Sequence, residues 1–163
     1  MSLPSGASVS QHESHGRLRL LAWAAALAAC DHLTKWAAHS KVRGRLVVIP
    51  SWFSIAPTKN YGGLFGYFQG ARALLVAVSA AVLVALVIWV LRGGGKSRLT
   101  DAALSLAIAG AAGNLADRLA LGYVRDFVHV GFWPAFNLAD ALITIAIAMF
   151  LLAAIPVRSR QGG

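Results

Sequence analysis

The sequence predicts an all-α membrane protein with four transmembrane helices. Hydrophobic residues make up 58% of the 163 residues and charged residues only 13%, and the mean hydropathy is +0.65. A soluble domain of this length would need more polar surface. Each of four apolar runs approaches the ~20 residues that a helix needs to cross a bilayer core, where only internally bonded backbone is stable. The runs are at about 18–36, 73–91, 99–121 and 135–155.

The net charge of +9 would also suit a nucleic-acid-binding protein. The basic residues, however, are scattered near the ends of the apolar runs, which favours loop charge on a membrane protein, and we expect no nucleic acid partner. The single cysteine excludes an internal disulfide. Five dispersed histidines without an HExxH motif indicate no metal site. We therefore expect neither a metal nor another cofactor.

The first apolar run follows a polar segment, 1–16, that we expect to be disordered. This start also has features of a signal peptide, and the LAAC sequence ending at Cys30 resembles a lipoprotein lipidation site. The three later runs favour a spanning helix instead. Asp31 and Lys35 are four residues apart and can pair on one helix face. Lys35 alone would be interpreted as an interfacial lysine that snorkels to water, but the pair favours a functional role.

The longest stretch between apolar runs predicts two short strands, at 47–49 and 52–55, with Pro50 and Pro57 in turns. The sequence NYGGLFG at 60–66 follows. Its closely spaced glycines indicate either a close backbone approach or an ordinary interfacial hairpin with aromatic anchors.

The second run carries no charge after Arg72 and predicts a lipid-facing scaffold helix. The third run is rich in Ala and Gly, which lets helices approach closely in lipid. We expect its Gly110 and Gly113 to be packing residues. The polar stripe near its end consists of Gly110, Asn114, Asp117 and Arg118.

The fourth run contains Asp140 one turn after Asn137, and Asp126 precedes it across a short aromatic loop. A carboxylate inside a spanning segment costs roughly 2.5–3.5 kcal/mol on insertion scales and usually marks a site. Because successive spans alternate in direction, the polar ends of three runs fall at one membrane level, on the side of Asp126 and Asn60. They carry Asp31, Asn114, Asp117, Arg118, Asn137 and Asp140.

Two carboxylates that share a water can hydrolyse an amide, because one ionised acid takes a proton from water while the other, protonated, polarises the carbonyl. The sequence has no GxSxG elbow and no metal motif, and nothing marks Cys30 as a nucleophile. A small transporter or proton-relay protein is the alternative. It predicts polar groups throughout the membrane depth, whereas here they gather at one level.

Five motifs, in order, resemble bacterial lipoprotein signal peptidase, the type II signal peptidase. They are DHLTK (31–35), Asn60-x-Gly62 with Phe65, GAAGNLADR (110–118), VRDF (124–127) and FNLAD (136–140). The resemblance covers about 17–155. It implies an inner-membrane aspartic endopeptidase that removes the signal peptide from diacylglyceryl-modified prolipoproteins, cleaving before the lipidated cysteine.

The same resemblance implies site residues. The catalytic pair would be Asp126 and Asp140. A small extracytoplasmic β-cradle would form at about 41–70, between helices 1 and 2, and a segment near 122–134 would close over the substrate. The positions that would shape the site or bind substrate are Asp31, Lys35, Asn60, Gly62, Gly110, Asn114, Arg118 and Asn137.

We accordingly expect one peptidase domain at 17–156, a cytoplasmic N-terminus at 1–16 and a cytoplasmic tail at 157–163. Lys and Arg number seven on the side of the termini and six on the other, a weak bias, although the short basic loop at 92–98 favours termini inside. The active site would then lie near the outer face. The expected partners are lipidated prolipoprotein signal peptides and membrane lipids, and the expected state is a monomer.

One motif departs from the family pattern. The family usually has Asn-x-Gly-Ala-Ala-Phe, and here Gly63 and Leu64 replace the two alanines. We hypothesise that the bulkier Leu64, together with Tyr61, alters substrate choice or inhibitor binding. Comparison of cleavage profiles with Leu64→Ala would test it. The departure also leaves open a specialised or inactive relative of the peptidase.

Overall fold

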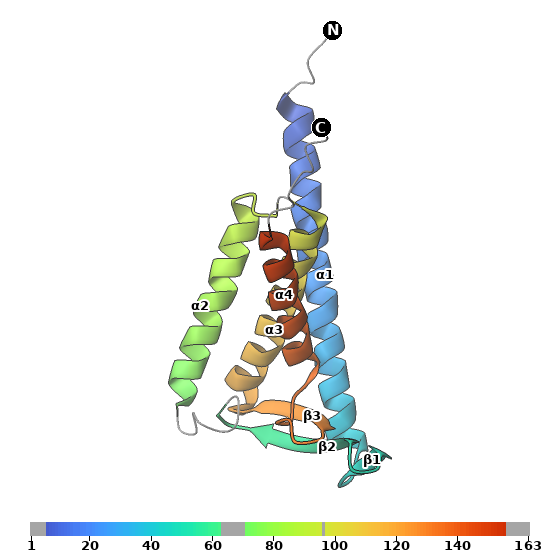
Figure 1. The fold of residues 1–163 in the computed structure, drawn as a ribbon. Helices are drawn as coiled ribbons and strands as arrows, with labels where there is room; N and C mark the ends of the chain where they lie inside the picture. The colour runs from blue at the N-terminus through green and yellow to red at the C-terminus, as the bar shows by residue number, and fades with distance from the viewer. Residues whose placement is uncertain (1–5, 63–70, 96, 156–163) are drawn as a thin grey trace, which may run out of the picture.

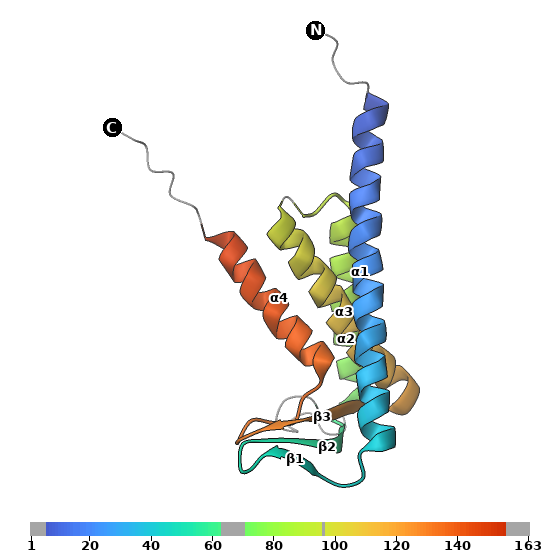
Figure 2. The ribbon, with the colours of Figure 1, turned by 90° about the vertical axis from the view of Figure 1, so that its right-hand side faces the viewer.

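The computed structural model describes residues 6–62, 71–95 and 97–155. Over these residues the chain forms four helices and one three-stranded antiparallel sheet, in the order α1 (Gly6–Lys41), β1 (Leu46–Ile49), β2 (Phe53–Asn60), α2 (Arg72–Leu91), α3 (Arg98–Leu121), β3 (Val124–Val130) and α4 (Leu138–Ala154). The sheet lies across one end of the helices, and the α2–α3 connection lies at the other (Figures 1 and 2).

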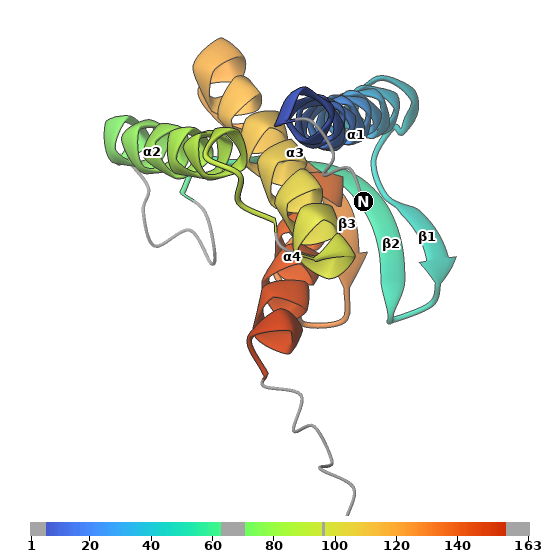
Figure 3. The same cartoon turned by 90° about the horizontal axis from the view of Figure 1, so that it is seen from above.

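Helix α3 is the centre of the bundle and packs against each of the other three helices. Seen from above, it lies between α1, α2 and α4 (Figure 3). Its small residues allow this arrangement: a Cβ added to Gly110 would lie 2.5 Å from the backbone oxygen of Ala139 on α4. The core cluster of buried side chains consists of Leu20, Ala24, Val90, Leu104, Ile108, Ala109 and Leu142.

Helix α4 begins at Leu138 because a capping box forms at its N-terminus. The Asn137 side chain accepts a hydrogen bond from the Asp140 N–H, and the Asp140 side chain accepts one from the Asn137 N–H. Phe136, just before the cap, is extended and bridges to Val128 of β3. The fourth apolar run therefore becomes helical three residues later than the predicted start at 135, with Asp140 in the first turn.

The sheet has the order β1-β2-β3, so the predicted cradle gains a third strand from the chain after α3. Pro57 lies within β2, not in a turn as predicted, at an irregularity in the β2–β3 register between Ile55 and Thr58. Proline has no N–H to donate to a ladder, and strands accept it at such irregularities.

Strand β3 occupies most of the stretch that we expected to be a loop. It pairs with β2 from Phe53↔Val130 to Asn60↔Val124. The local reason is the content of β-branched residues, since Val124, Val128 and Val130 all favour extended backbone. The residues between the two acids are thus a strand and a short connection to α4.

The expectation of a disordered segment at 1–16 is wrong for residues 6–16, which belong to α1. The cause is cooperative: once the apolar part of α1 is helical, each added residue needs no new nucleus. Cys30 lies inside this continuous helix, and α1 does not end at the lipidation-like sequence.

By length and hydropathy, two helices among the described residues could cross a membrane, α2 and α3, and α4 is a shorter apolar helix. Within Arg72–Leu91 of α2, Val90 is buried and most other side chains face outward. An apolar, outward-facing helix agrees with the predicted lipid-facing scaffold.

Candidate active site

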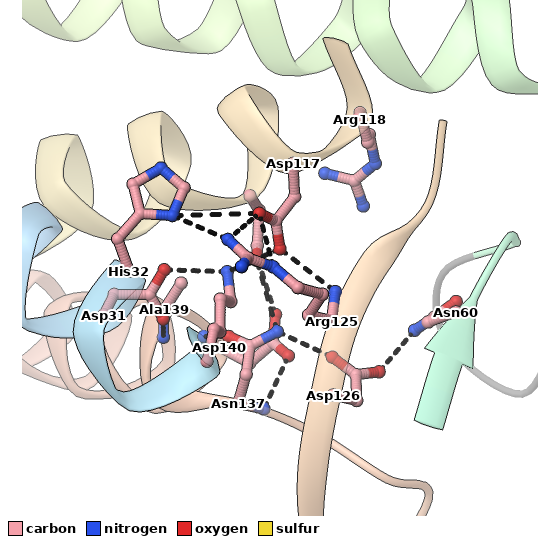
Figure 4. Close-up of polar contacts among 12 residues, drawn as sticks. Asp31, His32, Asn60, Asp117, Arg118, Arg125, Asp126, Asn137, Ala139 and Asp140 are labelled. Atoms are coloured by element: carbon pink, nitrogen blue, oxygen red, sulfur yellow. Dashed lines mark hydrogen bonds and ion pairs between the residues drawn. The ribbon is translucent and has the colours of Figure 1, made fainter. Parts of the chain in front are cut away.

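The two acids of the predicted pair come from different elements and meet at Asn137. Asp126 lies on β3 and is 1% exposed, and Asp140 lies in the first turn of α4. The Asn137 Nδ2 donates a hydrogen bond to Asp126 Oδ1 (2.6 Å), and the Asn137 backbone N–H donates to Asp140 Oδ2 (3.2 Å). One residue therefore contacts both carboxyl groups (Figure 4).

Two more asparagines complete the shell around the acids. Asn60, the last residue of β2, donates from Nδ2 to Asp126 Oδ2 (2.8 Å). Asn114, on α3, donates from Nδ2 to Asp140 Oδ1 (2.7 Å). Each of the four carboxyl oxygens thus accepts one hydrogen bond from the protein, so both acids are held in position before any substrate binds.

The orientation of each amide follows from its other contacts. The Oδ1 of Asn60 accepts the Gly62 N–H (3.1 Å), and the Oδ1 of Asn114 accepts Lys35 Nζ (2.9 Å). The Oδ1 of Asn137 accepts the Asp140 N–H (3.1 Å). Backbone N–H groups and ammonium groups only donate, so a flipped amide would set donor against donor. Each NH₂ group is thereby aimed at a carboxylate.

Lys35 is fully buried, so the snorkelling interpretation of this lysine is wrong. Its Nζ lies 2.7 Å from Asp31 Oδ2 and 3.4 Å from Asp117 Oδ2. The i,i+4 pair predicted with Asp31 is confirmed. Burial is tolerated because two carboxylates and the Asn114 oxygen satisfy the ammonium group.

Asp31 joins α1 to the other two helices of the site. Its Oδ1 accepts the Ala139 N–H of α4 (2.8 Å). A Cβ at Gly113 would lie 2.4 Å from Asp31 Oδ2, so the carboxylate occupies space that only glycine leaves free. Gly110 and Gly113 are packing residues, as predicted.

Burial raises the pKa of Asp126 to about 6. Hydrogen bonds from Asn60 and Asn137 oppose this shift, while the nearby charge of Asp140 adds to it. A carboxyl group with such a pKa holds its proton over much of the mildly acidic range. Asp126 is therefore suited to act as an acid.

A cavity of about 510 Å³ opens beside Asp140. Asn60, Arg118 and Asp140 provide its polar wall, and Arg118 donates to Ser79 Oγ on α2 at 3.4 Å. The remaining wall is largely apolar. It consists of Val124, Trp133, Pro134, Ala135, Phe136, Ala141, Ile143, Thr144 and Ile145. Such a cavity suits an extended apolar peptide presented to an acid and a guanidinium group.

Five elements, α1, β2, β3, α3 and α4, thus bring together the residues predicted from the polar stripe and the spacing of the acids. Asn60, Gly62, Asn114, Asn137 and the two acids are in one hydrogen-bonded network, and Asp31 and Lys35 support it. Gly63, Leu64 and Phe65 of the Asn60 motif lie outside the described residues.

Sequence reasoning did not select two contacts beside Asp126. Arg125 forms an ion pair with Asp117 (2.7 Å), and His39 Nε2 lies 3.0 Å from the Asp126 backbone oxygen. Position 39 gives no local signal, because it is a polar residue at the end of a helix. Arg125 is adjacent to an acid, but its partner on α3 could not be inferred before the course of β3 was known.

Comparisons with known proteins relate this chain to lipoprotein signal peptidases. A family model described as signal peptidase (SPase) II matches residues 23–156. The chain is 39% identical to a lipoprotein signal peptidase of Rhizorhabdus wittichii, over 78% of this chain and 80% of the relative. It is 36% identical to the lipoprotein signal peptidase of Clostridium novyi, over 75% of this chain and 89% of the relative.

A solved structure described as a bacterial membrane enzyme superposes with a TM-score of 0.76 at 27% identity, covering 83% of this chain and 86% of that one. The sequence matches and the structural match therefore cover most of the same chain. On these matches, the chain belongs to the signal peptidase II family, the lipoprotein signal peptidases.

Proposed function

We propose that Asp126 and Asp140 activate a water molecule that hydrolyses the peptide bond before the diacylglyceryl-modified cysteine of a prolipoprotein. The observation that carries this proposal is the contact of Asn137 with both carboxyl groups. Membership of the family supports a peptidase that processes lipoproteins. The buried Asp126 and the partly exposed Asp140 at the cavity would supply the general acid and base that amide hydrolysis requires.

Asp140 is the base in this mechanism. It lies in the first turn of α4 and accepts the Asn137 backbone N–H, and the N-terminus of a helix favours a negative charge. Asp126, which lies on β3 and not in the first turn of a helix, takes the role of the acid. Asp140 takes a proton from water, and the water oxygen bonds to the substrate carbonyl carbon. The C=O π bond breaks, and the Asp126 proton is shared with the oxygen of the resulting tetrahedral intermediate.

The tetrahedral intermediate then collapses. Its C–N bond breaks, and the new α-amino group on the lipidated cysteine receives the proton held by Asp140. Asp126 recovers the proton that it shared with the oxygen, and the signal peptide leaves with a carboxyl terminus. Water has then added OH to carbon and H to nitrogen. Arg118 lies on the wall of the cavity and would hold substrate carbonyl oxygens or the developing negative charge.

The proposed setting is the bacterial inner membrane. The four helices, α2 and α3 most clearly, would span the bilayer as one peptidase domain at 17–156, with the termini in the cytoplasm and the sheet at the outer face. The apolar cavity beside Asp140 then opens at the level where a signal peptide leaves the membrane. Bilayer lipids and a monomeric state complete the proposal.

The test uses purified protein in detergent and a diacylglyceryl-modified precursor, with release of the signal peptide followed by mass spectrometry. We expect Asp126→Asn and Asp140→Asn each to abolish cleavage, because an amide neither gives nor takes the required proton. The matched control is Asp101→Asn, which changes a carboxylate in the first turn of α3, at the other end of the helix from Arg118.

An unlipidated precursor should resist cleavage. Turnover by either active-site variant at more than a few per cent of the wild-type rate would contradict the two-aspartate mechanism. Equal cleavage of the unlipidated precursor would contradict the proposed substrate.

A further inference from the structure

The backbone on either side of the Asp126 side chain is bound to helices α1 and α3. The Arg125 N–H donates to Asp117 Oδ2 (3.0 Å), and the Asp126 carbonyl oxygen lies 3.0 Å from His39 Nε2. Asp117 comes from α3 and His39 from α1. These contacts are separate from those that the carboxyl group of Asp126 makes with the two asparagines.

The Arg125 side chain strengthens the first of these contacts. Its Nε and Nη2 both donate to Asp117 Oδ1, at 3.1 and 2.7 Å. The Asp117 carboxylate is 1% exposed and the Arg125 side chain 18% exposed. Charge-assisted bonds from a guanidinium fork in such a setting are strong and orient both partners.

The fork also reaches α1. Arg125 Nη2 lies 2.8 Å from His32 Nδ1, which must be unprotonated to accept this hydrogen bond. Figure 4 shows Arg125 between Asp117 and the His32 ring, with Asp126 next along the strand. Residues of α1 and α3 therefore bind the backbone of β3 at the Arg125 N–H and at the Asp126 carbonyl oxygen, on either side of the Asp126 side chain.

We propose that Arg125 and His39 are positioning residues that hold β3, and with it the carboxyl group of Asp126, in register with Asp140. The proposal rests on the proposed function, in which Asp126 is the acid. Neither residue touches the reacting atoms. Arg125 acts through Asp117 and His39 acts through the Asp126 backbone.

The geometry explains why positioning is needed here. Asp140 is fixed by the capping box of α4, whereas Asp126 sits on an outer strand that pairs with β2 on one side and on the other has only the short bridge from Val128 to Phe136 among the described backbone pairings. A displacement of about 1 Å between catalytic groups can cost roughly 100-fold in rate. Loss of the contacts that hold the strand in place should therefore lower kcat.

The first test compares Arg125→Met and Arg125→Lys with Lys59→Met. Lys59 is the cross-strand partner of Arg125 and lies over the Tyr123 ring, so its variant removes one charge from the same sheet without touching α3. We expect Arg125→Met to lower kcat by about 10- to 100-fold with KM within twofold. Arg125→Lys, which keeps the charge but lacks the fork, should restore part of the loss.

The second test concerns His39. His39→Leu removes the contact with the Asp126 carbonyl oxygen and should lower kcat several-fold, whereas His39→Gln retains an N–H donor and should recover most of the activity. In the double variant with Arg125→Met, the losses should combine to less than their product, because both residues restrain the same strand.

Hydrogen exchange of β3 measures the positioning itself, independently of catalysis. Peptides covering Val124–Val130 should exchange faster in Arg125→Met than in Lys59→Met or the wild-type protein, while α2 peptides stay unchanged. Asp126→Asn is assayed in parallel, and its full activity would overturn the proposed function.

With Asp126→Asn inactive, two results would overturn the positioning proposal alone. One is unchanged exchange of β3 in Arg125→Met. The other is a kcat for Arg125→Met that equals the kcat of Lys59→Met.

Discussion

Asparagine side chains contact both carboxyl groups of the proposed catalytic pair. Asn60, Asn114 and Asn137 each donate to a carboxyl oxygen, and each has its own oxygen occupied by an obligate donor. An amide neutralises no charge. It can therefore restrain an acid in position while leaving it free to gain or lose a proton.

Lys35 supports both Asp31 and Asn114. In Lys35→Met, Asp31 would lose its buried counter-charge, and Asn114 would lose the shorter of the two hydrogen bonds that its oxygen accepts, the other coming from Asn137. Breaking a buried ion pair in this way costs about 3 kcal/mol or more. We expect a clear fall in the thermal unfolding temperature in detergent, together with loss of cleavage.

The matched control is Lys41→Met, at an exposed lysine that lies over the Trp36 ring. It should unfold like the wild-type protein. Adding Asp31→Asn to Lys35→Met should recover part of the stability, since no buried charge then lacks a partner. Wild-type stability of Lys35→Met would refute this account.

Asn60 should tune the pH range of the enzyme. Burial raises the pKa of Asp126 to about 6, and the hydrogen bond from Asn60 holds it below the value that burial alone would give. If Asp126 must carry a proton, cleavage falls as the pH rises above its pKa. Removing the Asn60 donor stabilises the protonated form further, so the alkaline limb of the kcat profile should move to higher pH in Asn60→Ala.

The measurement is kcat against pH at saturating precursor for the two proteins. Thr58→Ser, at the Asp126 register partner on β2, serves as the control and should keep the wild-type profile. A limb that stays in place in Asn60→Ala, or moves to lower pH, would show that Asp126 is not the acid.

At the scale of elements, close packing of α3 against α1 and α4 places the site. Because Gly110 has no side chain, the backbones of α3 and α4 can approach each other. Because Gly113 has none, there is room for the Asp31 side chain. In lipid, where apolar burial supplies little driving force, such contacts between helices carry much of the association. Bundle packing and site assembly thus depend on the same surface of α3.

Alanine at either glycine should separate these helices. The added Cβ would lie 2.5 Å from the Ala139 backbone oxygen at position 110, and 2.4 Å from Asp31 Oδ2 at position 113. Overpacking of this kind costs about 1–3 kcal/mol. We expect Gly110→Ala and Gly113→Ala to unfold at lower temperature and to cleave more slowly.

Gly16→Ala supplies the control, because a Cβ at this position of α1 meets nothing within 4 Å. It should be neutral or slightly stabilising, as alanine favours helix over glycine. Wild-type unfolding and activity of Gly110→Ala would show that α3 and α4 tolerate separation.

At the scale of the whole molecule, the arrangement predicts which end of the helices faces each side of the membrane. The sheet and the α2–α3 connection lie at opposite ends of the helices (Figure 1). In a Cys30→Ser background, a membrane-impermeant maleimide applied to spheroplasts should label Arg45→Cys, just before β1. It should label Arg92→Cys, after α2, only once the membrane is permeabilised. Labelling of Arg92→Cys in intact spheroplasts would reverse the proposed topology.

Much of the site could be predicted from periodicity and direction alone. Asp31 and Lys35 at i,i+4, the stripe containing Asn114, and Asn137 before Asp140 are helical spacings, and antiparallel helices bring such ends together. The contacts of Asn114 with Lys35 and Asp140 confirm that inference. Local spacing suffices wherever a helix supplies the geometry.

The sequence by itself indicated the class of the protein, the candidate pair of acids and the end of the bundle where polar groups gather, because hydropathy and helical period are local properties of the chain. Only the tertiary structure decided that the segment carrying Asp126 is a strand paired with β2, that Lys35 is buried, and that Arg125 and His39 bind the neighbouring helices. These features depend on partners distant in the sequence, and a local pattern does not encode a long-range contact.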